Sequence, residues 1–150
     1  MKEKVLVVGG DSKIAKVLIP YLKKEKFSVI STTRRKKNVS RSKIFLNLLR
    51  INKFIFPKNV SLAIVLAGVD GHKNCYEDNQ YARYVNCVCV PNLVKKLIKK
   101  NFFVCFVSSS AVFISKPAFV KGESKYSPGD NYGIQKAIGE KKILNIVLSV

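Results

Sequence analysis

Two side chains near the end of the sequence could together move a proton. Tyr132 and Lys136 are four residues apart in the run Tyr132-Gly133-Ile134-Gln135-Lys136. In a helix this spacing puts both side chains on one face, one turn apart. A nearby ammonium stabilises the phenolate and lowers the pKa of the phenol, so the tyrosine can donate and accept a proton at working pH. The alternative is a half-buried helix with a solvated lysine.

Hydroxyl groups occur just upstream, directly after an apolar run. Phe102–Val107 is apolar throughout and predicts a strand buried on both faces, with Cys105 as a small core residue. Ser108, Ser109 and Ser110 follow it. Open α/β sheets bind their ligands at the carboxyl ends of the strands, so these hydroxyl groups are candidates for contact with a substrate or cofactor.

The N-terminal part of the chain predicts elements that bind a dinucleotide. Lys4–Val8 is a short apolar run that ends at Gly9, a helical pattern begins at Ile14, and Phe27–Ser31 predicts a second strand. Strand, glycine turn, helix and strand open a dinucleotide-binding unit, in which the helix N-terminus faces a pyrophosphate. An ordinary strand-to-helix turn is the alternative.

A basic cluster follows the second strand. The run from Thr32 to Lys37 contains Thr33, Arg34 and Arg35 and has no acidic residue. A carboxylate at this point would bind the ribose hydroxyls of NAD, whereas a basic cluster suits the 2′-phosphate of NADP. A solvated loop in a basic protein would look the same.

The rest of the chain continues the alternation of strands and helices. Further strands are expected around Ile44–Leu48, at Ser61–Gly68 and, as a sixth strand, at Ile146–Val150. A long helix is expected over Arg83–Lys100 with a kink or late start at Pro91, and another helix over Tyr132–Asn145. Loops are expected at Val69–Tyr81, with a helix start around Glu77 as an alternative, and at Ser115–Asp130. The pattern predicts one α/β domain over residues 1–150, a Rossmann-type doubly wound parallel sheet in three layers, α/β/α.

Composition limits the classes of function. The chain has 150 residues, of which 47% are hydrophobic, and a net charge of +19. No apolar run is long enough to span a bilayer, no signal peptide is evident, and the cysteine spacing matches neither a zinc site nor a disulfide framework, so a cytoplasmic protein without a metal is expected. The positive charge allows a nucleic-acid partner, but the charges are spread along the chain and are mostly lysine, which argues against that partner.

Taken in order, these features resemble the extended short-chain dehydrogenases/reductases, the NAD(P)-dependent epimerase/dehydratase group. The run Gly9-Gly10-Asp11-Ser12-Lys13-Ile14-Ala15 resembles their Gly-x-x-Gly-x-x-Gly turn, with Ser12 and Ala15 in place of the second and third glycines. Leu66-Ala67-Gly68 resembles the end of their fourth strand, and Tyr132 to Lys136 fits their Tyr-x-x-x-Lys motif. The run from Phe102 to Leu144 is most similar to dTDP-4-dehydrorhamnose reductase-like members, which are sugar-nucleotide reductases.

The resemblance implies hydride transfer at a nucleotide sugar, by a reductase, an epimerase or a dehydratase. Tyr132 would be the acid/base, and Lys136 would lower its pKa and bind the nicotinamide ribose. Ser109, with Ser110 as the fallback, would orient the substrate oxygen, and Asn86 would help to hold the lysine through water. NADP is the expected cofactor, with NAD as the alternative. The implied cofactor-binding residues are Gly9, Asp11, Ser12, Lys13, Ile14, Thr33, Arg34, Arg35, Leu66, Ala67, Gly68, Ser108, Tyr132 and Lys136.

Two further expectations concern the whole chain. Members of this family pair through the helices that correspond to 83–100 and 132–145, so a homodimer is expected. They also carry a C-terminal substrate-binding portion that we expect to be absent from this chain, which would leave it little activity alone. The competing hypothesis is a non-catalytic Rossmann module that senses a dinucleotide or binds anions or nucleic acid.

Overall fold

The computed structural model describes residues 3–77, 79–113 and 120–149. The chain divides into two compact units, of which the first comprises Met1–Ala67 and Asn92–Val107, and the second comprises Gly68–Pro91 and Ser108–Val150. The loop expected at Ser115–Asp130 lies partly outside the described residues, and its described part, residues 120–130, is loop as expected.

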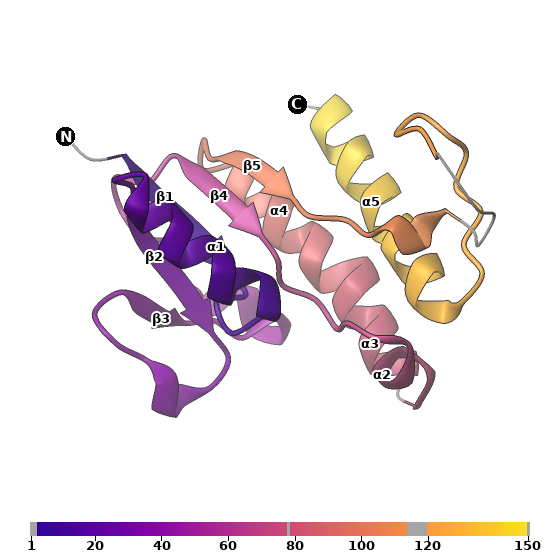
Figure 1. Ribbon diagram of the computed structural model, residues 1–150, viewed down its shortest axis with the longest axis horizontal. Helices are drawn as coiled ribbons and strands as arrows, with labels where there is room; N and C mark the ends of the chain where they lie inside the picture. Colours follow the sequence, from indigo (N-terminus) through magenta and orange to yellow (C-terminus); the bar gives the residue numbers. More distant parts are fainter. Residues whose placement is uncertain (1–2, 78, 114–119, 150) are drawn as a thin grey trace. The chain divides into compact units, whose positions relative to one another are not determined.

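Five parallel strands form the sheet of the first unit, in the order β3-β2-β1-β4-β5 (Figure 1). The central strand places Val5 opposite Val29 of β2 and Leu62 of β4. All neighbouring strands in this order run parallel, so each connection has to cross back to the amino end of the sheet. The strands are β1 (Lys4–Val8), β2 (Ser28–Thr33), β3 (Lys43–Phe45), β4 (Leu62–Val65) and β5 (Phe103–Phe106).

Helices cover both faces of this sheet. Helix α1 (Lys13–Lys24) packs Ala15 and Leu22 against Val5, Val7 and Val29. The helix α4 (Val90–Ile98) lies behind the sheet in Figure 1, where α1 lies in front. Strand β1 is buried on both faces, as the continuous apolar run predicted. The expected doubly wound parallel α/β sheet in three layers is therefore confirmed.

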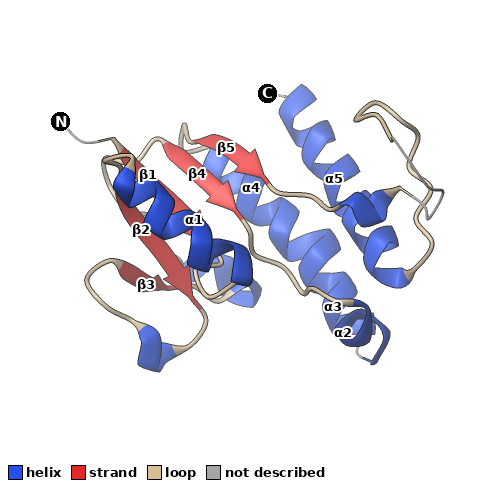
Figure 2. Cartoon of the chain, in the orientation of Figure 1, coloured by secondary structure: helices blue, strands red, loops and turns tan. Residues whose placement is uncertain are grey.

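The second unit is helical (Figure 2). Helix α5 (Asn131–Leu148) packs against the π-helical turn η3 (Val85–Cys89), the 3-10 turn η4 (Ser110–Val112) and α2 (His72–Glu77). Helix α3 (Asn79–Tyr84) leads directly into η3, and η3 leads into α4. The first unit holds two more 3-10 turns, η1 (Lys36–Asn38) and η2 (Leu48–Lys53).

The helix expected over Arg83–Lys100 exists, but it starts earlier and contains a π turn. Pro91 has no N–H group, so it cannot donate to the carbonyl of Cys87, four residues earlier. Lys142 of α5 donates to that carbonyl instead, with 2.9 Å between Nζ and the oxygen. The proline therefore neither ends the helix nor delays it, since a side chain from α5 satisfies the carbonyl group that it leaves without a helical partner.

Two expectations about local structure were wrong. The segment from Ile146 to Leu148 is the last turn of α5 and not a sixth strand, and Val150 lies outside the described residues. A short apolar run at the end of a helical pattern fits either a strand or the last turn of a helix. Here the helix continues, because each residue added to an existing helix gains one backbone hydrogen bond. The loop expected over Val69–Tyr81 contains α2, whose start is stabilised by Cys75 N donating to Gly71 O and by Asn74 Nδ2 donating to Asp70 O.

The burial expected for the strand at Phe102–Val107 was also wrong. Side chains of β5 alternate in exposure, and Phe103 is 75% exposed. Cys105 is exposed too, so it is not a core residue. Strand β5 is an edge of the described sheet, bonded only to β4, and a strand at an edge need not be buried on both sides even when every residue in it is apolar.

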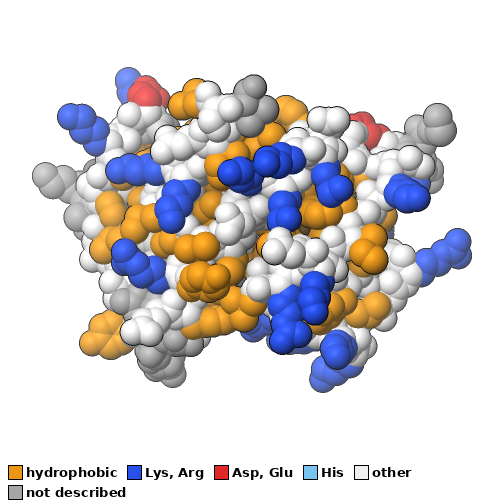
Figure 3. Space-filling model, turned by 180° about the vertical axis from the view of Figure 1, so that it is seen from behind, with side chains coloured by type: hydrophobic (Ala, Val, Ile, Leu, Met, Phe, Trp, Pro, Cys, Tyr) orange, Lys and Arg blue, Asp and Glu red, His pale blue; other side chains and the backbone are white. Residues whose placement is uncertain are grey.

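Among the helices of the described part of the chain, none has the length and apolar character that crossing a bilayer requires. Lysine and arginine side chains are spread among hydrophobic ones over the face shown in Figure 3, with isolated acidic groups. The charge of +19 is therefore not gathered into a single patch on this face.

Candidate functional site

The turn after β1 brings two backbone segments into close contact. Gly9 has a φ of 91°, and a Cβ there would lie 2.9 Å from the Ala67 nitrogen and 3.1 Å from the Leu66 carbonyl carbon. Gly9 N donates to Thr32 Oγ1 at 3.0 Å, and Leu66 N donates to Val8 O at 2.9 Å. Only glycine fits this position without strain, so the turn and the end of β4 form one continuous backbone surface at the carboxyl edge of the sheet.

Ser12 replaces the second glycine of the turn without backbone strain. Its φ of −70° is ordinary for serine, and its hydroxyl accepts a hydrogen bond from Ala15 N as the N-cap of α1, at 3.1 Å between Oγ and N. The first N–H groups of α1, at Lys13 and Ile14, have no partner within a helix, and the positive end of the helix dipole lies there. A helix N-terminus after a close-approach glycine suits a pyrophosphate, so the residues present fit this part of a dinucleotide.

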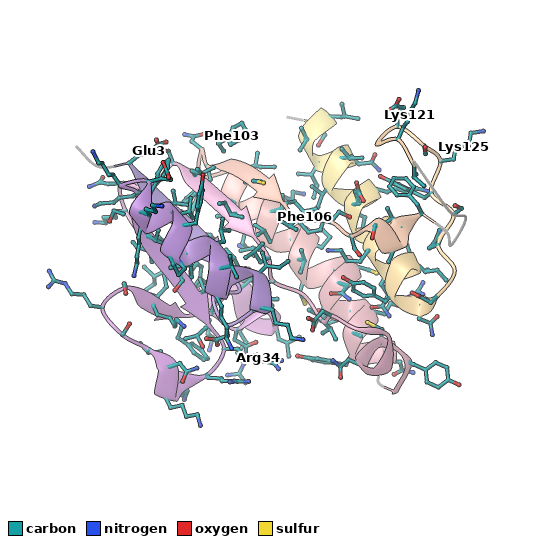
Figure 4. The ribbon with its side chains drawn as sticks, in the orientation of Figure 1. Glu3, Arg34, Phe103, Phe106, Lys121 and Lys125 are labelled. Atoms are coloured by element: carbon teal, nitrogen blue, oxygen red, sulfur yellow. The ribbon has the colours of Figure 1, made fainter. Side chains whose placement is uncertain are left out.

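The carboxyl end of β2 carries both signs of charge. Arg34 and Arg35 are exposed, and Arg34 lies near the arrowhead of β2 in Figure 4. Thr33 donates from Oγ1 to Asp11 Oδ2 at 2.5 Å, and Lys43 of β3 forms an ion pair with Asp11 Oδ1 at 3.1 Å. Burial would raise the pKa of Asp11, but hydrogen bonds from Thr33, Lys43 and Asn38 and the charge of Lys43 outweigh burial and lower it. Asp11 is therefore ionised at neutral pH.

In the second unit, Asn86 ties the segment after β4 to helix α5. Its side chain is 5% exposed and accepts from Val69 N at 2.9 Å. The same amide donates to Val69 O at 3.0 Å and to Gln135 Oε1 at 2.9 Å. A Cβ on Gly68 would come within 2.9 Å of Asn86 Oδ1. The hydrogen bonds of Asn86 thus connect Val69 with Gln135, the residue before Lys136. The water-mediated link from Asn86 to Lys136 stays a prediction.

Helix α5 carries the tyrosine and the lysine, and the expectation that this segment is helical is confirmed. Asp130 is its N-cap and accepts from Gly133 N at 2.7 Å. Tyr132 and Lys136 lie one turn apart and are both partly exposed. Burial lowers the pKa of Lys136 below its ordinary value, and the charge of Glu140 acts in the opposite direction.

The three serines after β5 lie in different environments. Ser108 donates to Glu140 Oε2 at 2.7 Å, Ser109 caps η4 by accepting from Ala111 N at 3.2 Å, and Ser110 is exposed. A hydroxyl that accepts one bond can still donate another, so the cap leaves Ser109 able to donate to a substrate oxygen.

Helix α5 and the turn that carries these serines are packed together. A Cβ on Gly133 would overlap the Ala111 carbonyl oxygen, so only glycine allows the start of α5 to approach η4 this closely. The structure thus brings the elements that carry Tyr132 and Ser109 together. A contact between the two hydroxyl groups stays a prediction.

The sequence analysis did not identify two of the residues described above, Lys43 beside Asp11 and Glu140 on α5. Lys43 was not singled out, because strand β3 is short and its register on β2 is not visible in the sequence. Glu140 follows Lys136 by four residues, and this helical spacing would have indicated it. Burial and then the carboxylate of Glu140 raise the pKa of Tyr126, so Glu140 is also a partner of the loop before α5.

A model of the NAD dependent epimerase/dehydratase family matches residues 5–148. The chain belongs to this family. No curated protein sequence matches the chain. Solved structures that resemble it share 17% to 22% of its sequence, so they show the fold.

Three of these structures illustrate the similarity. MoeE5 in complex with UDP-glucuronic acid and NAD is 22% identical with a TM-score of 0.78, over 95% of this chain and 49% of that chain. The dTDP-4-dehydrorhamnose reductase of Bacillus anthracis in complex with NADP is 18% identical with a TM-score of 0.79, over 97% and 50%. The UDP-glucuronic acid 4-epimerase of Bacillus cereus, with UDP-glucuronic acid and NAD, is 18% identical with a TM-score of 0.73, over 95% and 52%. The chain spans about half the length of these proteins.

Proposed function

We propose that this chain is the NAD(P)-binding domain of a nucleotide-sugar reductase, epimerase or dehydratase that acts by hydride transfer. The observation that carries the proposal is the arrangement on α5, where Tyr132 and Lys136 lie one turn apart and Gly133 packs on the turn that carries Ser109. The bound nicotinamide would supply or accept the hydride, and the similar structures solved with NAD or NADP and with UDP-glucuronic acid support this choice of cofactor and substrate.

The residues of the chain would divide the remaining work. The Gly9 turn and the start of α1 would bind the pyrophosphate, with Leu66, Ala67 and Gly68 under the cofactor. Lys136 would bind the nicotinamide ribose, with its ammonium on the same helix one turn from Tyr132. Tyr132 would donate a proton to a sugar carbonyl oxygen or remove one from a sugar hydroxyl. Ser109, or Ser110 beside it, would orient that oxygen, and Ser108 would line the cofactor site.

NADP is the cofactor that we propose, with NAD as the alternative. Arg34 and Arg35 are exposed after β2 and could each form a charge-assisted hydrogen bond with a 2′-phosphate.

Asn86 would help to hold Lys136 in position, since its side-chain amide donates a hydrogen bond to Gln135, the residue before Lys136.

A fluorescence titration with NADPH and NADH tests the proposal. We expect Lys136→Met to weaken binding of both cofactors by roughly ten-fold or more, because a charge-assisted bond to the ribose is lost. Tyr132→Phe should leave binding nearly unchanged and should abolish any turnover of nucleotide-linked keto sugars. Lys95→Met and Tyr76→Phe are matched controls at exposed positions. A parent protein that binds neither cofactor would refute the proposal.

The net charge of +19 favours a second candidate, a non-catalytic module that senses a dinucleotide or binds anions or nucleic acid. In that case affinity for random DNA would exceed affinity for the cofactors and would fall steeply with salt.

We also propose a homodimer that forms through the helices spanning 83–100 and 132–145. Exposed apolar side chains on α5, including Ile134 and Leu144, support this surface. Light scattering after size exclusion would give the mass directly. The four cysteines are free thiols, which suits a reducing compartment, and we propose the cytoplasm.

A further inference from the structure

An acidic side chain lies at the carboxyl end of β2, although the run from Thr32 to Lys37 at that end contains none. Asp11 belongs to the turn after β1, and β1 and β2 are neighbours in the sheet. The carboxylate of Asp11 accepts the Thr33 hydroxyl on one oxygen and the Lys43 ammonium on the other, at 2.5 and 3.1 Å. Parallel strands end at the same edge of a sheet. The turn after β1 therefore places the negatively charged Asp11 side chain beside the carboxyl end of β2, which has no acidic residue of its own.

This position has a meaning in a dinucleotide-binding sheet. A carboxylate at the end of the second strand accepts hydrogen bonds from the ribose hydroxyls of NAD, and it repels the 2′-phosphate of NADP. The side chains of Asp11 and Lys43 are 25% and 29% exposed, so both remain accessible to a ligand from solvent. Arg34 and Arg35, directly after β2, add exposed positive charge. The end of β2 therefore carries a carboxylate that favours NAD and cations that favour NADP.

We propose that Asp11 and Lys43 are the residues that set the choice between NAD and NADP, an inference that rests on the proposed function. The Asp11 carboxylate accepts from the ribose hydroxyls and opposes the 2′-phosphate. The Lys43 ammonium neutralises part of that charge and, with Arg34 and Arg35, attracts the phosphate. With Asp11 and Lys43 both present, the preference for NADP over NAD is therefore small. Arg34 and Arg35 without the Asp11 carboxylate would make this preference large.

Dissociation constants for NADH and NADPH, measured by fluorescence on the whole chain, test this inference. Asp11→Asn keeps an oxygen that can accept from Thr33 and removes the charge. We expect it to raise the ratio of the NADH constant to the NADPH constant by roughly ten-fold or more, since a repulsive charge becomes neutral and Lys43 is released to the phosphate. Lys43→Met should lower the same ratio, and it does not alter the glycine turn.

Glu25→Gln is the matched control, because Glu25 is exposed and lies before β2, at the opposite end of that strand. It removes the same charge and should leave the ratio unchanged. An unchanged or lowered ratio in Asp11→Asn, with cofactor binding intact in the parent protein, overturns this inference and leaves the proposed function standing. A lowered ratio in Lys43→Met supports the inference even if Asp11→Asn fails to fold. No binding of either cofactor to the parent protein overturns both.

Discussion

At the scale of single residues, the proposed role of Tyr132 depends on the charge of Lys136. Burial lowers the pKa of Lys136 and the charge of Glu140 raises it, with burial the larger influence. An ammonium that is partly desolvated interacts more strongly with a neighbouring phenolate than one in water does. The charge of Glu140 favours the protonated form of this lysine, and its carboxylate also accepts from Ser108, so we regard Glu140 as a positioning residue.

The lowered pKa of Lys136 has a consequence for stability. Between the folded-state pKa and the ordinary value of 10.5, the unfolded chain binds more protons than the folded chain. The contribution of Lys136 to the free energy of unfolding therefore rises with pH in that interval and is constant below it. We expect the parent protein to gain stability relative to Lys136→Met as the pH rises toward 10.5, measured by urea unfolding at a series of pH values.

Glu140→Gln should widen this interval, because the lysine pKa falls further when the carboxylate is neutral. Glu123→Gln, at an exposed position of the same unit, should not change it. A stability difference that stays flat or declines over the alkaline range would show that Lys136 is not desolvated in the folded chain.

The cysteines differ in exposure and therefore in reactivity. Burial raises the pKa of the Cys75, Cys87 and Cys89 thiols, whereas Cys105 is exposed on β5. Since the thiolate is the reactive form, iodoacetamide should modify one thiol per chain rapidly and the other three only slowly. Mass spectrometry of the native protein would identify the site. Rapid labelling of more than one cysteine, or rapid labelling that persists in Cys105→Ser, would contradict the burial described above.

At the scale of elements, the joint between α5 and η4 depends on one glycine. An alanine at Gly133 would gain up to about 1 kcal/mol in helix propensity, but its Cβ would overlap the Ala111 carbonyl. Overpacking of this kind costs about 1–3 kcal/mol, so we expect Gly133→Ala to lower the free energy of unfolding by about that amount. Relief of the overlap would also move the start of α5, and with it Tyr132, away from η4.

Gly122→Ala supplies the comparison, because nothing lies within 4 Å of a Cβ at that position. Its free energy of unfolding should stay within about 0.5 kcal/mol of the parent value. Equal stability of the two variants would mean that α5 and η4 are not in close contact in solution.

Much of the fold was predictable from the sequence, because β1 and β4 are continuous apolar runs that lead to a glycine, Gly9 and Gly68. The β1, α1, β2 and β4 assignments and the helical spacing of Tyr132 and Lys136 follow from such local patterns. Failures occurred where a partner far away in the sequence decides the structure. The Cys87 carbonyl, which Pro91 cannot bond, is satisfied by Lys142, 55 residues beyond Cys87, so no local pattern could indicate that the helix continues.

The candidate site was predictable to the same extent. Residue types and spacing indicated Tyr132, Lys136 and the serines after β5, and the resemblance supplied their roles. The position of Asp11 beside Thr33 was not predictable, because it depends on the order of strands in the sheet and on the register of β3. Asp11 lies one strand earlier in the sequence, and no local pattern places it at the end of β2.

At the scale of the whole molecule, the charge of +19 acts on every anionic ligand. It attracts cofactors and nucleic acid alike and raises their rates of association, but salt screens it beyond about 8 Å at 0.15 M ionic strength. Contacts between a phosphate and a cation within a site are screened much less. Salt can therefore separate binding that depends on the whole-molecule field from binding that depends on a defined site.

We expect NADPH to lose modest affinity between 50 and 500 mM NaCl, and NADH to lose less because it lacks the 2′-phosphate. Random double-stranded DNA should bind weakly. The logarithm of its affinity should fall steeply with the logarithm of the salt concentration, with a slope roughly proportional to the number of phosphates that the protein neutralises. Titrations by fluorescence and by anisotropy of labelled DNA, at four salt concentrations, would give the three slopes. A different result would be a salt dependence for NADPH as steep as that for DNA, with displacement of NADPH by DNA. NADPH would then bind through the overall positive charge and not at a defined site, which would favour the non-catalytic module over the proposed enzyme domain.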